Sequence, residues 1–332
     1  FKRPAAEDLV IYELLVRDFV GSRWYKTVAD TLPYLKKMGI NAIELMPIME
    51  FTGNESWGYN PTFHLAPDKA YGTSQDLKAL IDKCHENGIA VILDMVLNQA
   101  DYEFPYVKMY WEGSQPSANS PMFNQQATHP FSVFFDFNHE APATKAYVER
   151  VNEFWLKEYH FDGYRFDLSK GFTQTNSGTD VARWGRYDAS RIAIWKRIYD
   201  QIRKTDPTAY VILEHFADDQ EEAELTNYGM MVCVLTPSIY WVASALWCQA
   251  MSRALAASTP VSCAAHSPLL RIQSGRAGYA PVFCVPGAGD SVTGFVGLSE
   301  ALGRDIRAIV TPPDALEAAL AAGTLALAPK FE

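Results

Sequence analysis

The sequence predicts an α/β protein whose fold class is a (β/α)8-type TIM barrel, incomplete or irregular after the fifth strand. Five short apolar segments alternate with segments whose apolar residues recur at helical spacing. The apolar segments contain few polar residues, which is typical of parallel strands buried on both faces. Long loops rich in aromatic residues are expected on one rim of the sheet, and this favours a barrel over an open sheet.

The first part of the chain is accounted for by five strands and four helices. We expect strands over residues 9–15, 41–45, 89–97, 161–167 and 209–213. We expect helices over residues 28–38, 74–87, 143–159 and 189–203. Gly39 is expected to end the first helix, and Ser74 is expected to cap the second. Residues 47–71 and 100–138 are expected to form long loops.

The composition changes near Met231, and we place a domain boundary between residues 1–231 and 232–332. All of the net charge of −10 lies in the first part, because Lys plus Arg and Asp plus Glu each number 6 after Met231. The alanine-rich second part is interpreted as a segment of different origin and a candidate for completing the barrel. Within it we expect helices over 239–257 and 313–322, a strand over 282–285 and a turn over 286–289.

Charge and hydropathy argue against several classes of partner. A net charge of −10 disfavours binding to a nucleic-acid backbone. No apolar run is long and clean enough to span a membrane, because residues 232–257 are interrupted by Pro237, Gln249 and Arg253. The five cysteines are odd in number and lack the spacing of metal ligands, so we expect free thiols and no cysteine metal site.

Three acidic residues, Asp94, Asp167 and Glu214, lie at the ends of expected strands, where a barrel of this kind carries its active site. Arg165 and Asp167 are two residues apart and therefore share one face of a strand. An arginine beside an aspartate is expected to keep the carboxylate ionised and oriented, as a nucleophile requires. The alternative is that the two residues form a purely structural ion pair.

The strands that carry Asp167 and Glu214 are expected to be neighbours, about 5 Å apart. This spacing matches the roughly 5–5.5 Å between the two carboxyl groups of a retaining glycosidase. Asp167 would then be the nucleophile, while Glu214, which follows an apolar strand, suits protonation of a leaving group. Aromatic residues of the two long loops suit stacking on sugar rings, with ordinary loop packing as the alternative for many of them.

Four motifs, in order along residues 8–231, resemble the α-amylase family of glycoside hydrolases. They are Trp57-Gly-Tyr-Asn-Pro61, Asp94-Met-Val-Leu-Asn98, Gly163-Tyr-Arg-Phe-Asp167 and Glu214-His215. The resemblance implies that Asp167 is the nucleophile and Glu214 the acid/base, and that the substrate is an oligosaccharide or polysaccharide. The residues that it implies for substrate binding are Arg165, Tyr59, Asp94, Gln99, Lys170, His215 and Trp57. Calcium is a candidate cofactor near Asp94 and Asn98.

The chain departs from this family at two places. Gln99 stands where the family has a histidine, and no His-Asp pair supplies the family's third essential acid after Met231. Asp290, Asp305 and Asp314 are the candidate replacements. Residues 278–303 resemble instead the first strand and oxyanion turn of α/β-hydrolase thioesterases, although no Gly-x-Ser-x-Gly follows.

Three functions follow from these residues. The first is a retaining α-glycosidase that acts on α-glucans, maltooligosaccharides or α-glucosides, with broad specificity. The second is a catalytically impaired, carbohydrate-binding barrel, because the third acid is missing. The third is an ester hydrolase that uses the tail.

Overall fold

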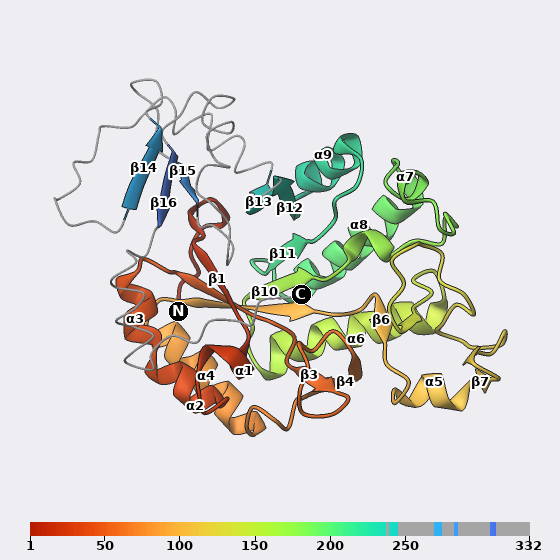
Figure 1. Ribbon diagram of the computed structural model, residues 1–332, viewed down its shortest axis with the longest axis horizontal. Coiled ribbons are helices and arrows are strands. Elements are labelled where there is room, and N and C mark those ends of the chain that lie inside the picture. Colours follow the sequence, from red (N-terminus) through yellow and green to blue (C-terminus); the bar gives the residue numbers. More distant parts are fainter. Residues whose placement is uncertain (237–238, 245–268, 274–281, 285–305, 310–332) are drawn as a thin grey trace. The chain divides into compact units, whose positions relative to one another are not determined.

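The computed structural model describes residues 1–236, 239–244, 269–273, 282–284 and 306–309 (Figure 1). The chain divides into two compact units, Phe1–Cys233 and Val234–Glu332, and each is described by itself. That the second unit has a different origin remains a proposal. No helix in the described part of the chain is long and apolar enough to cross a membrane.

A parallel sheet forms the centre of the first unit. Its strands follow the spatial order β1-β2-β5-β10-β11-β12, and each runs parallel to its neighbours. The strands are β1 Ile11–Leu14, β2 Ala42–Leu45, β5 Ala90–Met95, β10 Gly163–Phe166, β11 Tyr210–Leu213 and β12 Met231–Thr236. Every residue of β2, β5, β10 and β11 is buried, as expected for parallel strands covered on both faces. The five predicted strands are therefore confirmed.

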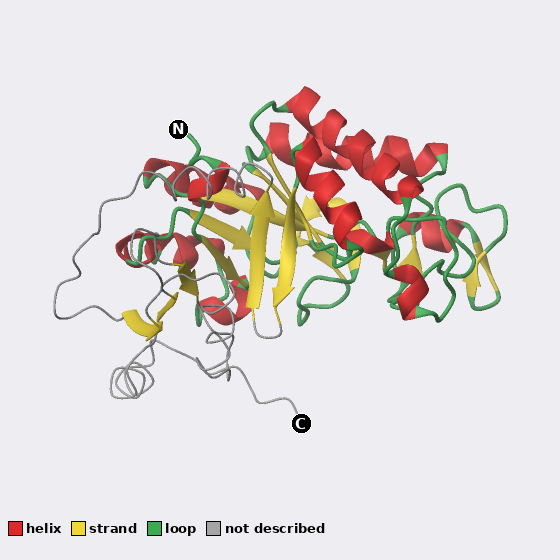
Figure 2. Ribbon diagram, turned by 90° about the horizontal axis from the view of Figure 1, so that it is seen from above, coloured by secondary structure: helices red, strands yellow, loops and turns green. Residues whose placement is uncertain are grey.

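Helices connect successive strands, and Figure 2 shows them in red around the yellow sheet. They are α1 Val16–Phe19, α2 Tyr25–Asp30, α3 Leu32–Lys37, α4 Ser74–Glu86, α5 Pro105–Met109, α6 Pro142–Glu158, α7 Val181–Trp184, α8 Ala189–Thr205 and α9 Asp219–Tyr228. Two short 3-10 turns are η1 Ala6–Asp8 and η2 Ser169–Gly171. The predicted helices over 74–87, 143–159 and 189–203 are confirmed within one or two residues.

Two details of the predicted helices are wrong. The helix expected over 28–38 is broken at Thr31 into α2 and α3, because Pro33 lacks the N–H that would continue the first helix and instead begins the second. The cap of α4 is Thr73 rather than Ser74. The Thr73 hydroxyl accepts a bond from the Asp76 amide, while the Asp76 carboxylate accepts one from the Thr73 amide.

Both long loops contain short regular pieces. The first holds an antiparallel pair, β3 Met49–Phe51 and β4 Pro61–Pro67. The second holds α5 and two antiparallel pairs, β6 Gln99–Ala100 with β9 Phe135–Asp136 and β7 Trp111–Glu112 with β8 Gln115–Pro116. Much of the second loop is packed around buried Phe104, Phe123 and Phe137, so packing explains these aromatic residues.

The described strands of the second unit include β13 Ile239–Ser244, β14 Leu269–Gln273, β15 Val282–Cys284 and β16 Ile306–Ile309. β16 pairs antiparallel with β14 and parallel with β15. The strand predicted over 282–285 is confirmed for its first three residues, whereas the predicted helix over 239–257 is wrong over Ile239–Ser244. The rest of that helix, the turn over 286–289 and the helix over 313–322 lie outside the described residues, as does most of 278–303.

Candidate active site

Arg165 is the centre of the candidate site. It lies on β10, and its guanidinium contacts the carboxylates of the two acids that follow β10 and β11. Nη1 lies 3.0 Å from Asp167 Oδ1, and Nη2 lies 2.9 Å from Glu214 Oε1. The sheet register explains this arrangement, because Phe166 pairs with Leu213 and places the next residue of each strand at the same edge. One side chain therefore brings together the two predicted catalytic acids.

Asp94 and Tyr59 complete this contact network. Arg165 Nη1 also lies 2.8 Å from Asp94 Oδ1, since Arg165 pairs with Asp94 across β10 and β5. The Tyr59 hydroxyl donates to Asp94 Oδ2 at 2.7 Å, which brings the loop before β4 to the site. Asp94 is fully buried, and both of its oxygens have partners within the protein. The structure therefore places Asp94 in support of Arg165 and Tyr59.

The expectation that Arg165 keeps Asp167 ionised is wrong. Burial, the largest effect, and the neighbouring Asp94 both raise the pKa of Asp167, and the attraction of Arg165 offsets them only in part, so the resulting pKa is about 8. The sequence could not show this, because it does not reveal how many acids share the one guanidinium. Glu214 is held by two contacts: Arg165 contacts Oε1, and the Leu168 amide donates to Oε2 at 2.9 Å.

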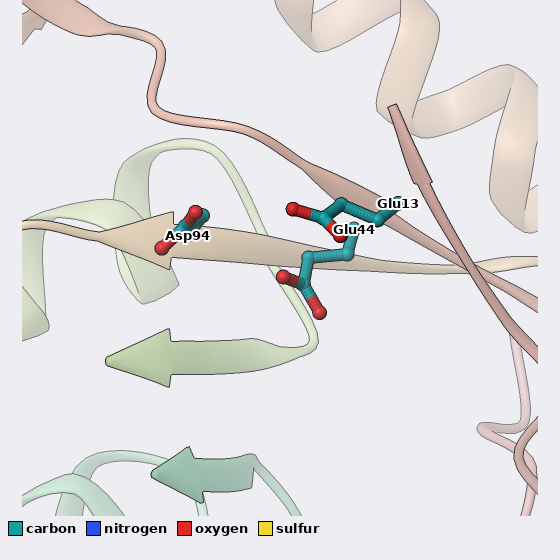
Figure 3. Close-up of side chains that lie close together, drawn as sticks. All are labelled: Glu13, Glu44 and Asp94. Carbon is teal, nitrogen blue, oxygen red and sulfur yellow. The ribbon is translucent and has the colours of Figure 1, made fainter. Parts of the chain in front are cut away.

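Two further acids lie on the same face of the sheet, and the sequence reasoning missed both. Figure 3 shows that Glu13 of β1 and Glu44 of β2 point toward Asp94. One oxygen of each of the three residues lies within 4.8 Å of the others. Burial raises the pKa of Glu44 and Glu13, and the charge of Asp94 adds to this. The sequence could have indicated both acids, because side chains alternate between the two faces of a strand, and this alternation places Glu13 and Glu44 on the inner face.

Gln99 and His215, which the resemblance implies for substrate binding, are both fully buried in this structure. Gln99 is fully buried, and its amide donates to the main-chain oxygen of Tyr59 at 2.9 Å, so it supports the loop. His215 is also fully buried beneath the site, where its two ring nitrogens contact Ser169 and Glu221. Both side chains are held by protein groups and are not exposed to solvent.

Lys170 and Trp57 lie nearer the surface. The Lys170 ammonium donates to the main-chain oxygen of Phe216 at 2.6 Å and lies 4.1 Å from the centre of the Trp184 ring. Burial lowers the pKa of Lys170. Trp57 is 48% exposed, which leaves much of its ring open to solvent. These two residues remain predicted substrate contacts.

A second polar cluster lies beside Gly171. Asn98 Oδ1, Asp136 Oδ1 and both ring nitrogens of His129 are buried and form no hydrogen bond, and His129 Nε2 lies 3.4 Å from Asp136 Oδ1. A Cβ atom on Gly171 would lie 2.0 Å from Asn98 Oδ1 and 2.9 Å from His129 Nε2, so these atoms point to one place. Both oxygens of Asp94 contact Tyr59 and Arg165 instead of this cluster, and calcium near Asp94 and Asn98 stays a prediction.

The third acid is not identified in the described part of the chain. The acids that surround Arg165 there are Glu13, Glu44, Asp94, Asp167 and Glu214. The candidate replacements Asp290, Asp305 and Asp314 lie outside the described residues. Cys84 and Cys233 are free thiols, as predicted for them.

These features define a class of protein: an α/β barrel with paired carboxylates at the carboxyl ends of two neighbouring strands. The profile described as "Alpha amylase, catalytic domain" matches residues 24–128. The malto-oligosyltrehalose trehalohydrolase of Saccharolobus solfataricus is 36% identical over 164 residues, which cover 48% of this chain and 27% of that protein. Alpha-amylase 3 of Dictyoglomus thermophilum is 28% identical over 247 residues, covering 68% of this chain and 46% of that protein.

Solved structures agree on the fold. The α-amylase of Geobacillus thermoleovorans, complexed with acarbose, has a TM-score of 0.53 and 24% identity, covering 69% of this chain and 51% of that one. An Anoxybacillus α-amylase has a TM-score of 0.55 and 21% identity, covering 69% of this chain and 52% of that one. The predicted fold class is confirmed. The matching profile and the related proteins support the predicted resemblance to the α-amylase family of glycoside hydrolases. The chain spans roughly a quarter to a half of the length of the relatives it matches.

Proposed function

We propose that this chain carries the active site of a glycosidase that cleaves α-glucosidic bonds with retention of configuration. The observation that carries the proposal is the sharing of the Arg165 guanidinium by Asp167 and Glu214 at the ends of neighbouring strands. Neighbouring strands hold two carboxyl groups at about the separation that a double displacement needs.

In the first step, the ionised Asp167 would attack the anomeric carbon, while Glu214 gives its proton to the leaving oxygen as the glycosidic bond breaks. In the second step, Glu214 would take a proton from water, whose oxygen attacks the anomeric carbon and releases Asp167. Arg165 would hold both carboxyl groups in place. Tyr59 is only partly buried and presents a ring beside the site, where it would pack on the sugar.

The substrates that we propose are α-glucans, maltooligosaccharides or α-glucosides. The related proteins are named as a trehalohydrolase, an α-amylase and 1,4-alpha-glucan branching enzymes, which favours α-linked glucose without selecting one of these substrates. Because no third acid is identified among the described residues and Gln99 faces inward, we expect slow turnover and broad specificity.

The test compares hydrolysis of nitrophenyl α- and β-glucosides and maltooligosaccharides by the protein and by Asp167→Asn. We expect cleavage of the α-linked substrates, and a loss of several orders of magnitude in the variant, because it lacks the nucleophile. Thermal unfolding of the variant controls for its folding. Retention of more than about a tenth of the rate would remove Asp167 from this role, since that corresponds to only about 1.4 kcal/mol.

A catalytically impaired carbohydrate-binding barrel is the second candidate. The raised pKa of Asp167, about 8, favours it, because a protonated aspartic acid is not a nucleophile at neutral pH. Binding of maltooligosaccharides, measured by calorimetry without release of reducing sugar between pH 6 and 9, would favour this candidate over the glycosidase.

We also propose that Asn98 and Asp136 hold a calcium ion that supports the long loop after β5. Their buried oxygens form no hydrogen bond and are the ligand type that calcium prefers, whereas the imidazole of His129, 3.4 Å from Asp136 Oδ1, is not. The ion would supply positive charge there, and no step of the reaction passes through it. We expect calcium to raise the melting temperature of the protein by a few degrees but not that of Asp136→Ala, as measured against a chelator control. An equal shift in both proteins would contradict the site.

A further inference from the structure

A hydrogen-bonded chain of buried side chains lies directly beneath Glu214. The Ser169 hydroxyl lies 2.9 Å from His215 Nδ1, and His215 Nε2 lies 2.8 Å from Glu221 Oε1. All three side chains are fully buried. Serine, histidine and glutamate are also the residue types of a hydrolytic triad, but a fully buried serine hydroxyl cannot reach a substrate. These three side chains can therefore affect the site only through the protein groups that they contact.

Glu221, at one end of this row of side chains, lies on α9 and contacts Arg191 of α8. Arg191 of α8 donates to the Glu221 carboxylate from Nε at 2.5 Å and from Nη2 at 2.8 Å. The Asp188 amide, at the cap of α8, donates to the same carboxylate at 2.8 Å. Burial lowers the pKa of His215, and the adjacent Glu221 carboxylate offsets this in part. His215 is thus held by a fixed, charged group rather than by solvent.

At the other end of this row of side chains, Ser169 contacts the main chain of Glu214. The Ser169 amide and hydroxyl both donate to the Glu214 main-chain oxygen, at 3.0 and 2.7 Å. The residue before Ser169 is Leu168, whose amide donates to the Glu214 carboxylate. Leu168 and Phe216 have φ angles of 45° and 49°, a left-handed conformation that costs free energy and persists only where surrounding contacts impose it.

We propose that Ser169 and His215 are positioning residues for the acid/base Glu214, and that Glu221 and Arg191 fix the orientation of His215. The Ser169–His215 contact joins the turn after β10, which follows the nucleophile, to the turn after β11, which follows the acid/base. The separation of the two catalytic carboxyl groups then depends on this buried contact as well as on Arg165. This inference rests on the proposed glycosidase activity.

The kinetic test uses Ser169→Ala, which removes the hydroxyl and keeps the amide. We expect kcat on maltooligosaccharides to fall by about 10- to 100-fold with KM nearly unchanged, because proton transfer needs exact geometry. The loss on nitrophenyl α-glucosides should be severalfold smaller, since their leaving group needs less protonation. His215→Gln should give the same pattern. Equal losses on both substrates, or no loss, would overturn the inference.

Ser177→Ala is the matched control. The Ser177 hydroxyl is also buried and also donates to a main-chain oxygen, that of Thr128 at 3.1 Å, in the same segment of chain. We expect this variant to retain the kinetics of the wild-type protein on both substrates. A drop equal to that of Ser169→Ala would show that any lost hydroxyl in this segment has the same effect, and would overturn the inference.

A crystal structure of Ser169→Ala gives a result that does not depend on activity. We expect the bond between the Leu168 amide and the Glu214 carboxylate to be broken in the variant and present in the wild-type protein. If the wild-type protein cleaves no glycoside, the proposed function fails. The presence or loss of the bond between the Leu168 amide and the Glu214 carboxylate then still tests whether Ser169 positions Glu214. A Glu214 carboxylate that keeps both of its contacts in a folded Ser169→Ala protein would overturn the inference.

Discussion

At the scale of single residues, the two proposed catalytic acids, Asp167 and Glu214, differ in their surroundings although one guanidinium contacts both. Arg165 Nη1 contacts both Asp94 and Asp167, so opposite charges act on the carboxyl group of Asp167. Glu214 is held by Arg165 and by the Leu168 amide, one contact to each oxygen. Two carboxyl groups with different environments are the usual basis for dividing nucleophilic and acid/base roles.

Glu214→Gln tests the acid/base role. The amide keeps the shape of the side chain but has no proton to give to a leaving group. We expect the rate on maltooligosaccharides to fall by at least about 100-fold, and the first step on dinitrophenyl α-glucosides to fall much less. Burst kinetics separate that first step from hydrolysis of the glycosyl-enzyme. Equal losses for good and poor leaving groups would show that Glu214 is not the general acid.

At the scale of elements, the contact between β10 and β11 positions the site. Gly163 permits this contact, because a Cβ atom at residue 163 would lie 2.3 Å from the main-chain oxygen of Tyr210 and 2.5 Å from its nitrogen. Those two atoms belong to the neighbouring strand, and main-chain atoms in a sheet cannot move away singly. The close approach of the two strands therefore requires a residue without a side chain at this position.

Gly163→Ala should separate β10 from β11 and destabilise the protein. We expect the free energy of unfolding to fall by about 1–3 kcal/mol, the usual cost of overpacking, and the rate of glycoside hydrolysis to fall with it. Denaturant unfolding measures the first effect. Gly21→Ala is the matched control, because nothing lies within 4 Å of a Cβ atom there. Equal stability of the two variants would contradict the requirement at Gly163.

The sequence predicted the elements better than it predicted the contacts between their side chains. Period and spacing correctly placed Arg165 and Asp167 on one face of a strand, since alternation is a local property. The inward orientation of Gln99 and His215 was not predictable from the sequence. Gln99 is held by Tyr59, which is remote in sequence, and His215 is held by Glu221 of the following helix, α9. Glu44 was missed because a single acid in an apolar strand gives no sign of the acids on adjacent strands.

At the scale of the whole molecule, an excess of acids around Arg165 links stability to pH. Burial, together with neighbouring carboxylates, raises the pKa of Glu13, Glu44, Asp94 and Asp167 in the folded protein. The folded state then binds more protons than the unfolded chain, so this contribution to stability is fully present below the ordinary carboxyl pKa of about 4. It is lost as pH rises through the folded pKa, which for Asp167 is about 8.

We expect the melting temperature to fall by several degrees between pH 5 and pH 9, and to fall less in Asp167→Asn, which has one acid fewer to ionise. Differential scanning calorimetry across this range measures both slopes. Activity should change in the opposite direction, with kcat/KM rising toward pH 8 as Asp167 ionises. Parallel slopes for the two proteins would show that Asp167 does not titrate in this range.

The contacts of Arg165 also bear on how this protein can change over evolutionary time. Three acids lie within 3.0 Å of its terminal nitrogens, and a fourth, Glu44, lies 3.9 Å from Nε. Lysine offers one compact charge in place of a planar fork and cannot contact both sides of the site. Lysine at position 165 would therefore lose some of these contacts, and loss of the positive charge would leave several acids repelling one another. Among the described residues, no second cation forms an ion pair with these acids, so a lineage that alters the arginine would have to change several acids together.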